Sequence, residues 1–331
     1  MSPVLGAALA SLLVFIGAMS VAGAMTLAER KVSAWMQYRI GPNRAGPWGL
    51  LQPLADVAKF FFKESSIPAG ANPTFFRLAP LLAAIPALLT FAVVPVSTPL
   101  SPGGKPLGAA DVEIGALYVL AVGSLSVYGI LIGGWASNNK YSLLGGLRAG
   151  AQLVSYELAL VLTLIAVLAS AGSLRLYDVV LAQDSVWNVL TQPVAFALFL
   201  VCAFAETNRH PFDFAECEPE LVAGYHTEYG ATRFMLFYVG EYVAMVTMAG
   251  LGTTLFLGGP DVPGVALADL PWWAGLISFS VKTGSFLFLY LWVRWSLPRL
   301  TYDRLMAFGW KRMLPVSLAN LLATGAVVSL S

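Results

Sequence analysis

Eight long apolar segments follow one another along the chain, separated by more polar stretches. Each is close to the roughly 20 residues that an α-helix needs to cross the hydrocarbon core of a bilayer. They are apolar around the whole helical circumference, whereas a surface helix of a soluble protein has one polar face. The pattern predicts transmembrane helices at 4–28, 78–96, 114–135, 149–171, 186–205, 234–257, 272–293 and 314–330, the last being the shortest.

The stretch after the first span has a different periodicity. Its apolar positions fall on one side of a helix and its polar positions on the other, namely Leu50, Leu54, Val57 and Phe61 against Gln52, Asp56, Lys59 and Lys63. Pro53 lies in the first turn, where proline is tolerated. We expect an amphipathic helix lying flat at the membrane interface. Two roles fit it: anchoring the chain, or framing an opening through which a lipid-like molecule enters.

Composition supports a membrane protein and excludes a soluble domain. Of the 331 residues, 58% are hydrophobic and only 11% are charged, whereas soluble domains have about 25% charged residues. With no internal repeat or long linker, the chain is expected to be one all-α integral membrane domain, residues 1–331. The start, MSPVLG, lacks a basic region, so no cleaved signal peptide is expected.

Several kinds of bound group are not expected on this chain alone. The two cysteines, Cys202 and Cys217, form no CxxC pair and have no metal-ligand spacing with the two histidines. No phosphate-binding or dinucleotide-binding glycine motif follows a strand-like run. The net charge of +1 gives no sign of a nucleic-acid partner. We therefore expect no metal and no covalently bound cofactor.

The distribution of lysine and arginine predicts orientation. Of the 19 basic residues, 16 lie in the loops after odd-numbered spans, at 29–77, 136–148, 206–233 and 294–313. Cytoplasmic loops carry such an excess. These four loops are therefore expected on the cytoplasmic side of a bacterial plasma (inner) membrane, with both termini on the opposite side.

Three ionisable residues fall inside predicted spans: Glu157, Glu241 and Lys282. Such groups are costly in the hydrocarbon region and mark functional sites by default. Two interpretations are open, a proton path and a structural ion pair, in which the glutamates pair with each other or with Lys282. Glu29 and Glu113 lie near span ends, where we expect solvated interfacial carboxylates.

The loop after the fifth span is the most unusual stretch, AETNRHPFDFAECEPELVAGYHTEYGATRF. Seven of the 18 acidic residues lie between 206 and 241: Glu206, Asp213, Glu216, Glu218, Glu220, Glu228 and Glu241. Aromatic residues and prolines lie among them. Like charges held close together must share protons or find cations. We expect a functional acidic cluster here; a plain solvated loop and a calcium site are the alternatives, although the spacing is not that of an EF-hand.

Three blocks of sequence carry a resemblance to a known family: AERKVSAWMQYRIGPNRAGPWGLLQPLADVAKFFFKE at 28–64, AETNRHPFDFAECEPELVAGYHTEYGATRFMLFYVGEY at 205–242, and WVRWSLPRLTYDRLMAFGWKRMLP at 292–315. SYE at 155–157 adds to them. The chain resembles, over essentially its full length, the H-type, quinone-site membrane subunit of respiratory complex I, the proton-translocating NADH:quinone oxidoreductase.

This resemblance implies a subunit of a translocase rather than an independent enzyme. Its cytoplasmic loops would dock on soluble quinone-site and iron–sulfur subunits and form with them a quinone chamber, entered from lipid near the first span, the amphipathic helix and the sixth span. Small membrane subunits and antiporter-like subunits would be its partners in the bilayer. Quinone would be the substrate, and NADH, FMN and iron–sulfur clusters would belong to partner subunits.

The resemblance also assigns residues by motif. Quinone contacts would come from Arg30 in AERK, from Tyr238 before GEY, and from Arg294 and Arg299 in WVRWSLPR. The proton path would take Asp56, Glu157, Glu206, Asp213, Glu216, Glu218, Glu220, Glu228 and Glu241. Cys217, Pro219 and Tyr238 depart from the residues common in the family, but none of these differences removes an ionisable group.

Two other functions are weighed against this one. A homologous membrane subunit occurs in energy-converting hydrogenases and related ferredoxin-driven ion pumps, but the first and third blocks favour the quinone enzyme. A stand-alone secondary transporter would typically show inverted repeats, and none is found. The sequence does not distinguish ubiquinone from menaquinone, nor does it identify the soluble electron donor.

Overall fold

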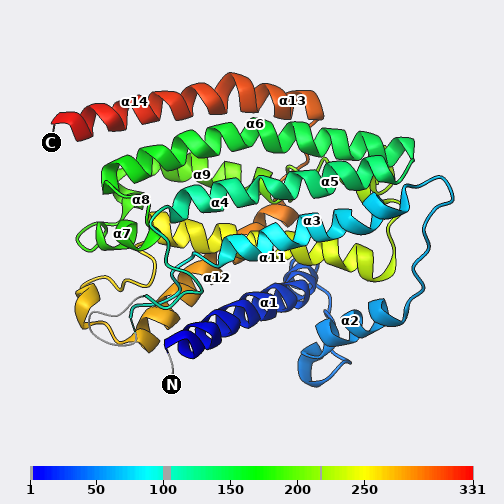
Figure 1. Ribbon diagram of the computed structural model, residues 1–331, viewed down its shortest axis with the longest axis horizontal. Coiled ribbons are helices and arrows are strands. Elements are labelled where there is room, and N and C mark those ends of the chain that lie inside the picture. The colour runs from blue at the N-terminus through cyan, green and yellow to red at the C-terminus, as the bar shows by residue number, and fades with distance from the viewer. Residues whose placement is uncertain (1–2, 100–105, 217, 331) are drawn as a thin grey trace.

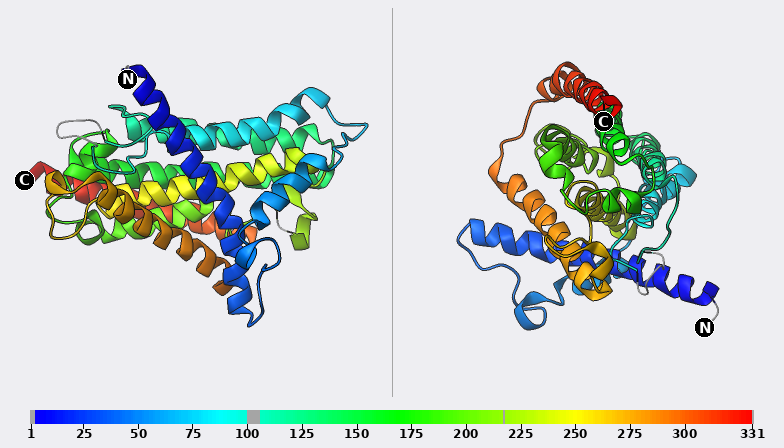
Figure 2. Two further views of the ribbon diagram at one scale, coloured as in Figure 1. Left: turned by 90° about the horizontal axis from the view of Figure 1, so that it is seen from below. Right: turned by 90° about the vertical axis from the view of Figure 1, so that its left-hand side faces the viewer.

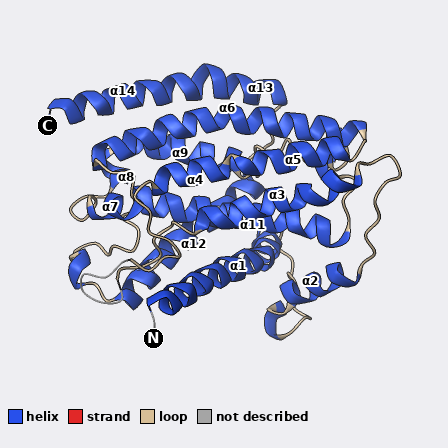
Figure 3. Cartoon of the chain, viewed as in Figure 1, coloured by secondary structure: helices blue, strands red, loops and turns tan. Residues whose placement is uncertain are grey.

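The computed structural model describes residues 3–99, 106–216 and 218–330. Within these ranges the chain forms helices joined by loops and has no strand beyond two isolated β-bridges (Figure 3). Seven of the described helices are long and apolar enough to cross a membrane, and an eighth apolar helix is shorter. The predicted all-α integral membrane fold is confirmed.

The long helices are α1 (Pro3–Met36), α3 (Pro73–Phe91), α6 (Lys140–Ala171), α11 (Ala231–Phe256) and α12 (Trp272–Ser296). Two further spans are built from consecutive pieces: α4 (Gly115–Gly123) with α5 (Leu125–Ala136), and α13 (Tyr302–Phe308) with η4 (Gly309–Met313) and α14 (Leu314–Leu330). The shorter apolar helix is α9 (Pro193–Glu206). The remaining elements are η1 (Pro47–Gly49), α2 (Gln52–Phe62), α7 (Leu176–Leu181), α8 (Asn188–Thr191), α10 (Glu218–Leu221), η2 (Gly224–His226) and η3 (Leu267–Asp269).

Most of the long helices run side by side along one axis, with α14 at one edge of the bundle and α1 at the other (Figure 1). Helix α1 crosses the others obliquely, as the left view of Figure 2 shows. The two chain ends lie toward one end of the bundle, whereas α2, the start of α11 and α13 lie at the opposite end. The predicted interfacial helix is therefore beside the acidic loop in space.

Small residues let the central helices approach closely. A Cβ atom added to Gly129 of α5 would lie 2.4 Å from the backbone nitrogen of Ala83 in α3. A Cβ atom added to Gly240 of α11 would lie 3.1 Å from the Cα of Ala84. Such contacts are typical of helix packing in membranes, where association depends on close van der Waals contact.

Several helices extend past the predicted spans. Helix α1 continues to Met36 rather than ending near 28, and α6 begins at Lys140 rather than at 149. Hydropathy detects where the apolar stretch ends, but no proline or glycine interrupts residues 29–36, so the helix continues. Conversely, α9 begins only at Pro193, because residues 188–191 form the separate helix α8.

Candidate functional site

A cavity of about 580 Å³ lies between α1, α2, α11 and α12. Most of its wall is apolar, with Met19 and Ala22 from α1, Phe60 from α2 and Phe234 from α11. Its polar lining includes Glu29, Arg30, Asp56, Tyr238, Tyr242 and Arg294. An apolar cavity of this size with a few convergent polar groups is typical of sites for small organic ligands.

Three of the four residues predicted to contact quinone line this cavity: Arg30, Tyr238 and Arg294. Arg30 forms an ion pair with Asp56, its Nη1 atom lying 2.7 Å from Oδ2, which ties α1 to α2. Arg299 does not line the cavity. It follows α12 and donates a hydrogen bond of 2.8 Å to Asp213.

A cluster of charges begins at the wall of the cavity, which Glu29, Tyr242 and Arg294 line. The Glu29 carboxylate forms an ion pair with Arg294 and accepts a 2.6 Å hydrogen bond from the Tyr242 hydroxyl. Arg209 Nη1 lies 3.5 Å from Glu29 Oε2, and Arg209 Nε lies 2.5 Å from Glu241 Oε1. The Arg209 guanidinium also stacks over the Tyr242 ring, 4.4 Å from its centroid. One arginine thus contacts two carboxylates from different helices.

This cluster corrects one prediction and adds residues that the sequence analysis missed. Glu29 is 8% exposed and ion-paired, so the expectation of a solvated carboxylate was wrong, whereas Glu113 is exposed as expected. Arg209 and Tyr242 were not among the predicted site residues. The signal for Arg209 was its position in ETNRHPFD, where it lies between two acids of the loop, Glu206 and Asp213.

Lys282 does not pair with either intramembrane glutamate. Its ammonium donates to the backbone carbonyl oxygens of Leu257 (2.6 Å), Gly259 (3.1 Å) and Asp261 (2.6 Å). It also lies 4.2 Å from the centroid of the Trp187 ring. These carbonyl groups belong to the segment that follows α11, and backbone carbonyls outside a helix need hydrogen-bond donors, so Lys282 has a structural explanation next to the end of α11. The hypothesis of a Lys282–glutamate pair was wrong.

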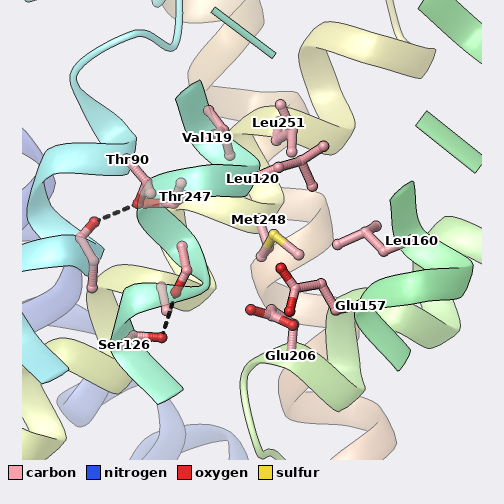
Figure 4. Close-up of a pocket in the computed structure, with 13 residues that line it drawn as sticks. Thr90, Val119, Leu120, Ser126, Glu157, Leu160, Glu206, Thr247, Met248 and Leu251 are labelled. Carbon is pink, nitrogen blue, oxygen red and sulfur yellow. Dashed lines mark hydrogen bonds between the residues drawn. The ribbon is translucent and has the colours of Figure 1, made fainter. Parts of the chain in front are cut away.

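Two small cavities continue inward from Glu241. One of about 50 Å³ is lined by Glu206, Glu216 and Glu241, and the other, of about 60 Å³, by Glu157 and Glu206. Figure 4 shows Glu157 and Glu206 pointing toward each other, with Thr247 and Ser126 nearby. Glu206 therefore lines both cavities. A polar cavity needs only about 10–15 Å³ to hold a water molecule, so both are large enough for water.

Glu157 contacts a polar residue in the middle of an apolar span. Ser124 lies at the junction of α4 and α5, where the backbone keeps helical dihedral angles. The Ser124 hydroxyl donates a hydrogen bond to the Glu157 carboxylate, and it also lies 2.8 Å from the Leu120 carbonyl oxygen. This contact places a polar group next to a carboxylate in the middle of an apolar stretch, which hydropathy does not reveal.

The remaining described acids of the loop also have partners. Glu216, which lines the first inner cavity, has its Oε1 atom 3.7 Å from His226 Nδ1. Glu228 accepts a 2.6 Å hydrogen bond from Asn139, whose side chain also caps α6. Glu220 lies 2.5 Å from Arg148, and its side chain is 47% exposed. The side chain of Glu218 lies outside the described part of the structure.

Burial shifts the pKa values of two side chains in the acidic loop. It raises the pKa of the Asp213 carboxyl to about 7, and Glu216 adds to this rise while Arg299 opposes it. Burial lowers the pKa of His210 to about 4, with further lowering by Arg299 and Arg294. His210 is therefore neutral near pH 7, whereas Asp213 can take up or release a proton there.

Among the side chains that the structure describes, no three His, Cys, Asp or Glu residues are arranged as a metal site. The site can instead hold an apolar molecule with a polar head, beside groups that bind protons. Fold and site together define a class: a multi-pass helical membrane protein in which ion-paired carboxylates extend inward from an apolar cavity.

Comparison with known proteins identifies the family. The family model described as NADH dehydrogenase matches residues 9–325. The chain is 50% identical over 320 residues to the NADH-quinone oxidoreductase H-type subunit 1 of Geobacter metallireducens, covering 96% of this chain and 95% of that protein. It is 51% identical over 318 residues to the H-type subunit 2 of Geobacter sulfurreducens, covering 96% and 94%, and 49% identical over 315 residues to the H-type subunit of Thermomicrobium roseum, covering 92% and 90%.

The chain therefore belongs to the family of H-type subunits of NADH-quinone oxidoreductase, which are membrane subunits of respiratory complex I. The predicted family is confirmed, as is the prediction that the chain is one part of a multi-subunit translocase and not an enzyme alone. The names of these relatives favour complex I over the related hydrogenases and over a stand-alone transporter.

Proposed function

We propose that the 580 Å³ cavity is the membrane part of a quinone chamber and that the carboxylates behind it move protons when the quinone is reduced. The observation that carries this proposal is the double contact of Arg209. It contacts Glu29, which lines the large cavity, and Glu241, which lines the first inner cavity. A change of charge in the cavity thus acts on the inner carboxylates through one guanidinium.

The cavity suits each part of an isoprenoid quinone. The apolar residues of α1, α2 and α11 fit the tail, and Arg30 and Arg294 provide cations for the headgroup. Arginine stays protonated at any relevant pH, so it stabilises the negative charge that forms as electrons arrive. Reduction of a quinone to a quinol consumes two electrons and two protons, and the electrons come from a donor on a partner subunit.

The ionisable side chains behind the chamber lie in a series along which protons can move. From Glu29 and Arg209 the series continues to Glu241, then across the 50 Å³ cavity to Glu206, and across the 60 Å³ cavity to Glu157. When negative charge forms near Arg294, that arginine and Arg209 are drawn from their carboxylates, which then hold protons more tightly. Oxidation or release of the quinol reverses this change, so proton affinity follows the redox state.

Orientation and partners complete the proposal. The basic loops would face the cytoplasm, with both termini on the opposite side. Soluble quinone-site and iron–sulfur subunits would dock there, near Arg299 and Asp213, and the NADH, FMN and iron–sulfur clusters would belong to those subunits. Small membrane subunits and antiporter-like subunits would continue the proton path from Glu157.

A matched pair of glycine substitutions tests the chamber. Gly23 lines the cavity, and a Cβ atom there would meet nothing within 4 Å, so Gly23→Leu fills space without a backbone clash. Gly17, also on α1 and equally free of contacts, does not line the cavity. Leucine favours a helix more than glycine, so neither change should unfold α1.

In the assembled complex, we expect Gly23→Leu to raise the KM for quinone about tenfold or more, because a leucine side chain occupies the space of the substrate. Gly17→Leu should leave the KM unchanged. The measurement is NADH:quinone oxidoreductase activity against quinone concentration, with assembly checked by native electrophoresis. An unchanged KM in the correctly assembled Gly23→Leu complex would refute the assignment of this cavity.

A further inference from the structure

A second large cavity lies on the other side of α12. It has a volume of about 940 Å³ and is lined by α9, α12, the segment after α12, α13 and η4. Val293 lines this groove, whereas its neighbour Arg294 lines the proposed quinone chamber. The right view of Figure 2 shows the segment after α12 running across to α13, which borders the groove. Helix α12 thus separates two sites.

The floor of this groove is hydrocarbon. It is formed by aliphatic and aromatic side chains, including Leu200, Val201, Phe204, Leu289, Val293 and Leu300. Most of these residues come from helices that are apolar enough to lie in lipid. A molecule held here would therefore present an apolar part of considerable length to α9 and α12.

The groove also has a cationic edge, formed by Arg304, Lys311 and Arg312. All three are exposed, and none forms an ion pair with an acid in the part of the chain that the structure describes. Asp303 is next in sequence to Arg304 but does not line the groove. All three cations line the same groove, so their charges act on the same place.

We propose that this groove binds an anionic phospholipid of the surrounding membrane. Its acyl chains would lie against α9 and α12, and its phosphate would contact Arg304, Lys311 and Arg312. An apolar floor beside unpaired cations at the interfacial end of a bundle complements an amphipathic anion, and basic residues at the membrane surface attract anionic lipids. This proposal is independent of the quinone chamber, since no residue is shared between the two cavities.

Local photo-crosslinking tests the proposal in the assembled complex. The photoreactive residue p-benzoylphenylalanine is placed at Leu300, and the complex is reconstituted in vesicles of equimolar phosphatidylglycerol and phosphatidylcholine. Mass spectrometry then gives the ratio of the two lipid adducts on this chain. We expect phosphatidylglycerol adducts to exceed phosphatidylcholine adducts by about fivefold or more, because each basic residue near an anionic membrane surface strengthens the association with anionic lipid by about fivefold.

Charge removal identifies the cause of this preference. Each basic residue near an anionic membrane surface contributes about fivefold in lipid association, so Lys311→Gln with Arg312→Gln should lower the adduct ratio by about fivefold or more. The matched control, Arg77→Gln with Lys140→Gln, removes two exposed cations at the same end of the bundle but outside the groove. It should leave the ratio unchanged.

Two results would overturn the proposal. One is an adduct ratio near one in the wild-type chain, which would mean that the groove holds lipid without selecting its charge. The other is a crosslink from position 300 to a neighbouring protein subunit in place of lipid, which would mean that the groove is a protein interface. Assembly of every variant is confirmed by native electrophoresis, and all four exchanged side chains are exposed.

Discussion

Arg209 is the residue on which the inner charge cluster depends. Its side chain is 7% exposed, and it contacts the carboxylates of Glu29 and Glu241 and the ring of Tyr242. A second guanidinium, from Arg294, also contacts Glu29. Two carboxylates and two arginines are therefore in contact within one cluster, so negative charge added by a reduced quinone acts on these ion pairs.

Replacing Arg209 with glutamine should leave Glu241 buried without its cation. Removing one partner of a buried ion pair typically costs about 3–5 kcal/mol, so Arg209→Gln should lower the temperature at which the complex inactivates. Arg209→Gln combined with Glu241→Gln should be less damaging than Arg209→Gln alone, because no unpaired charge remains. Thermal inactivation of the purified complex measures both variants.

The control for this comparison is Arg148→Gln, which breaks an exposed pair with Glu220 and should have little effect on stability. If the losses caused by Arg209→Gln and Glu241→Gln simply added together, the two side chains would not be coupled. The proposed transfer of charge through Arg209 would then be wrong.

The sequence predicted which residues are unusual but not which of them meet. Local hydropathy indicates which residues lie within a membrane span, so the charged residues Glu157, Glu241 and Lys282 could be singled out from the sequence. Their partners come from distant parts of the chain: Ser124 for Glu157, Arg209 for Glu241, and carbonyl groups after α11 for Lys282. Only the three-dimensional packing of helices brings such partners together.

At the scale of the elements, α2 combines two faces with different surroundings. Pro53, Asp56 and Phe60 face the large cavity, whereas Leu54 and Phe61 are 66% and 63% exposed. An apolar stripe of this kind at the membrane interface is suited to contact lipid. The predicted stripe of Leu50, Leu54, Val57 and Phe61 is therefore divided: Leu54 and Phe61 are exposed, whereas Val57 lines the cavity beside Asp56, which pairs with Arg30.

Making this stripe polar should impair access of the substrate from lipid. We expect Leu54→Asn with Phe61→Asn to raise the KM for a long-tailed quinone several-fold, since the helix no longer lies firmly in the interface. The KM for a short-tailed, water-soluble quinone should change little. Activity titrations with both substrates make the comparison, and Lys59→Gln with Lys63→Gln serves as the exposed control at the C-terminal end of the same helix. Equal KM changes for both quinones would contradict the proposed role of α2.

The spans themselves were accessible to sequence analysis, but their ends and polar contacts were not. Charges at Glu29 and Arg30 suggested that the first span had ended, yet α1 continues to Met36, and Glu29 pairs with Arg209 and Arg294. The contact of Ser124 with Glu157 leaves no mark in hydropathy, since both α4 and α5 are apolar. Ion pairs and hydrogen bonds between helices decide these features, and neither is local in sequence.

At the scale of the whole molecule, the arrangement joins two kinds of site at one end of the bundle. The large cavity opens between α1, α2, α11 and α12, and the acidic loop and inner carboxylates lie behind it. Helix α12 separates this cavity from the groove with the cationic edge. The family could be predicted from three sequence blocks, whereas this spatial division could not, because it depends on which way neighbouring residues of α12 face.

The central claim is that carboxylates behind the chamber carry the protons whose movement accompanies quinone reduction. Glu206 tests it most directly because it lines both inner cavities. Glu206→Gln keeps the size of the side chain but removes a group that can hold and release a proton. Glu113→Gln, an exposed acid outside these cavities, is the control.

The measurement is proton translocation by the reconstituted complex, recorded together with the rate of NADH oxidation by quinone. We predict that Glu206→Gln lowers both by about tenfold or more, that an uncoupler does not restore the rate of NADH oxidation, and that Glu113→Gln matches the wild type. A Glu206→Gln complex that pumps protons at the wild-type rate and ratio would contradict the account.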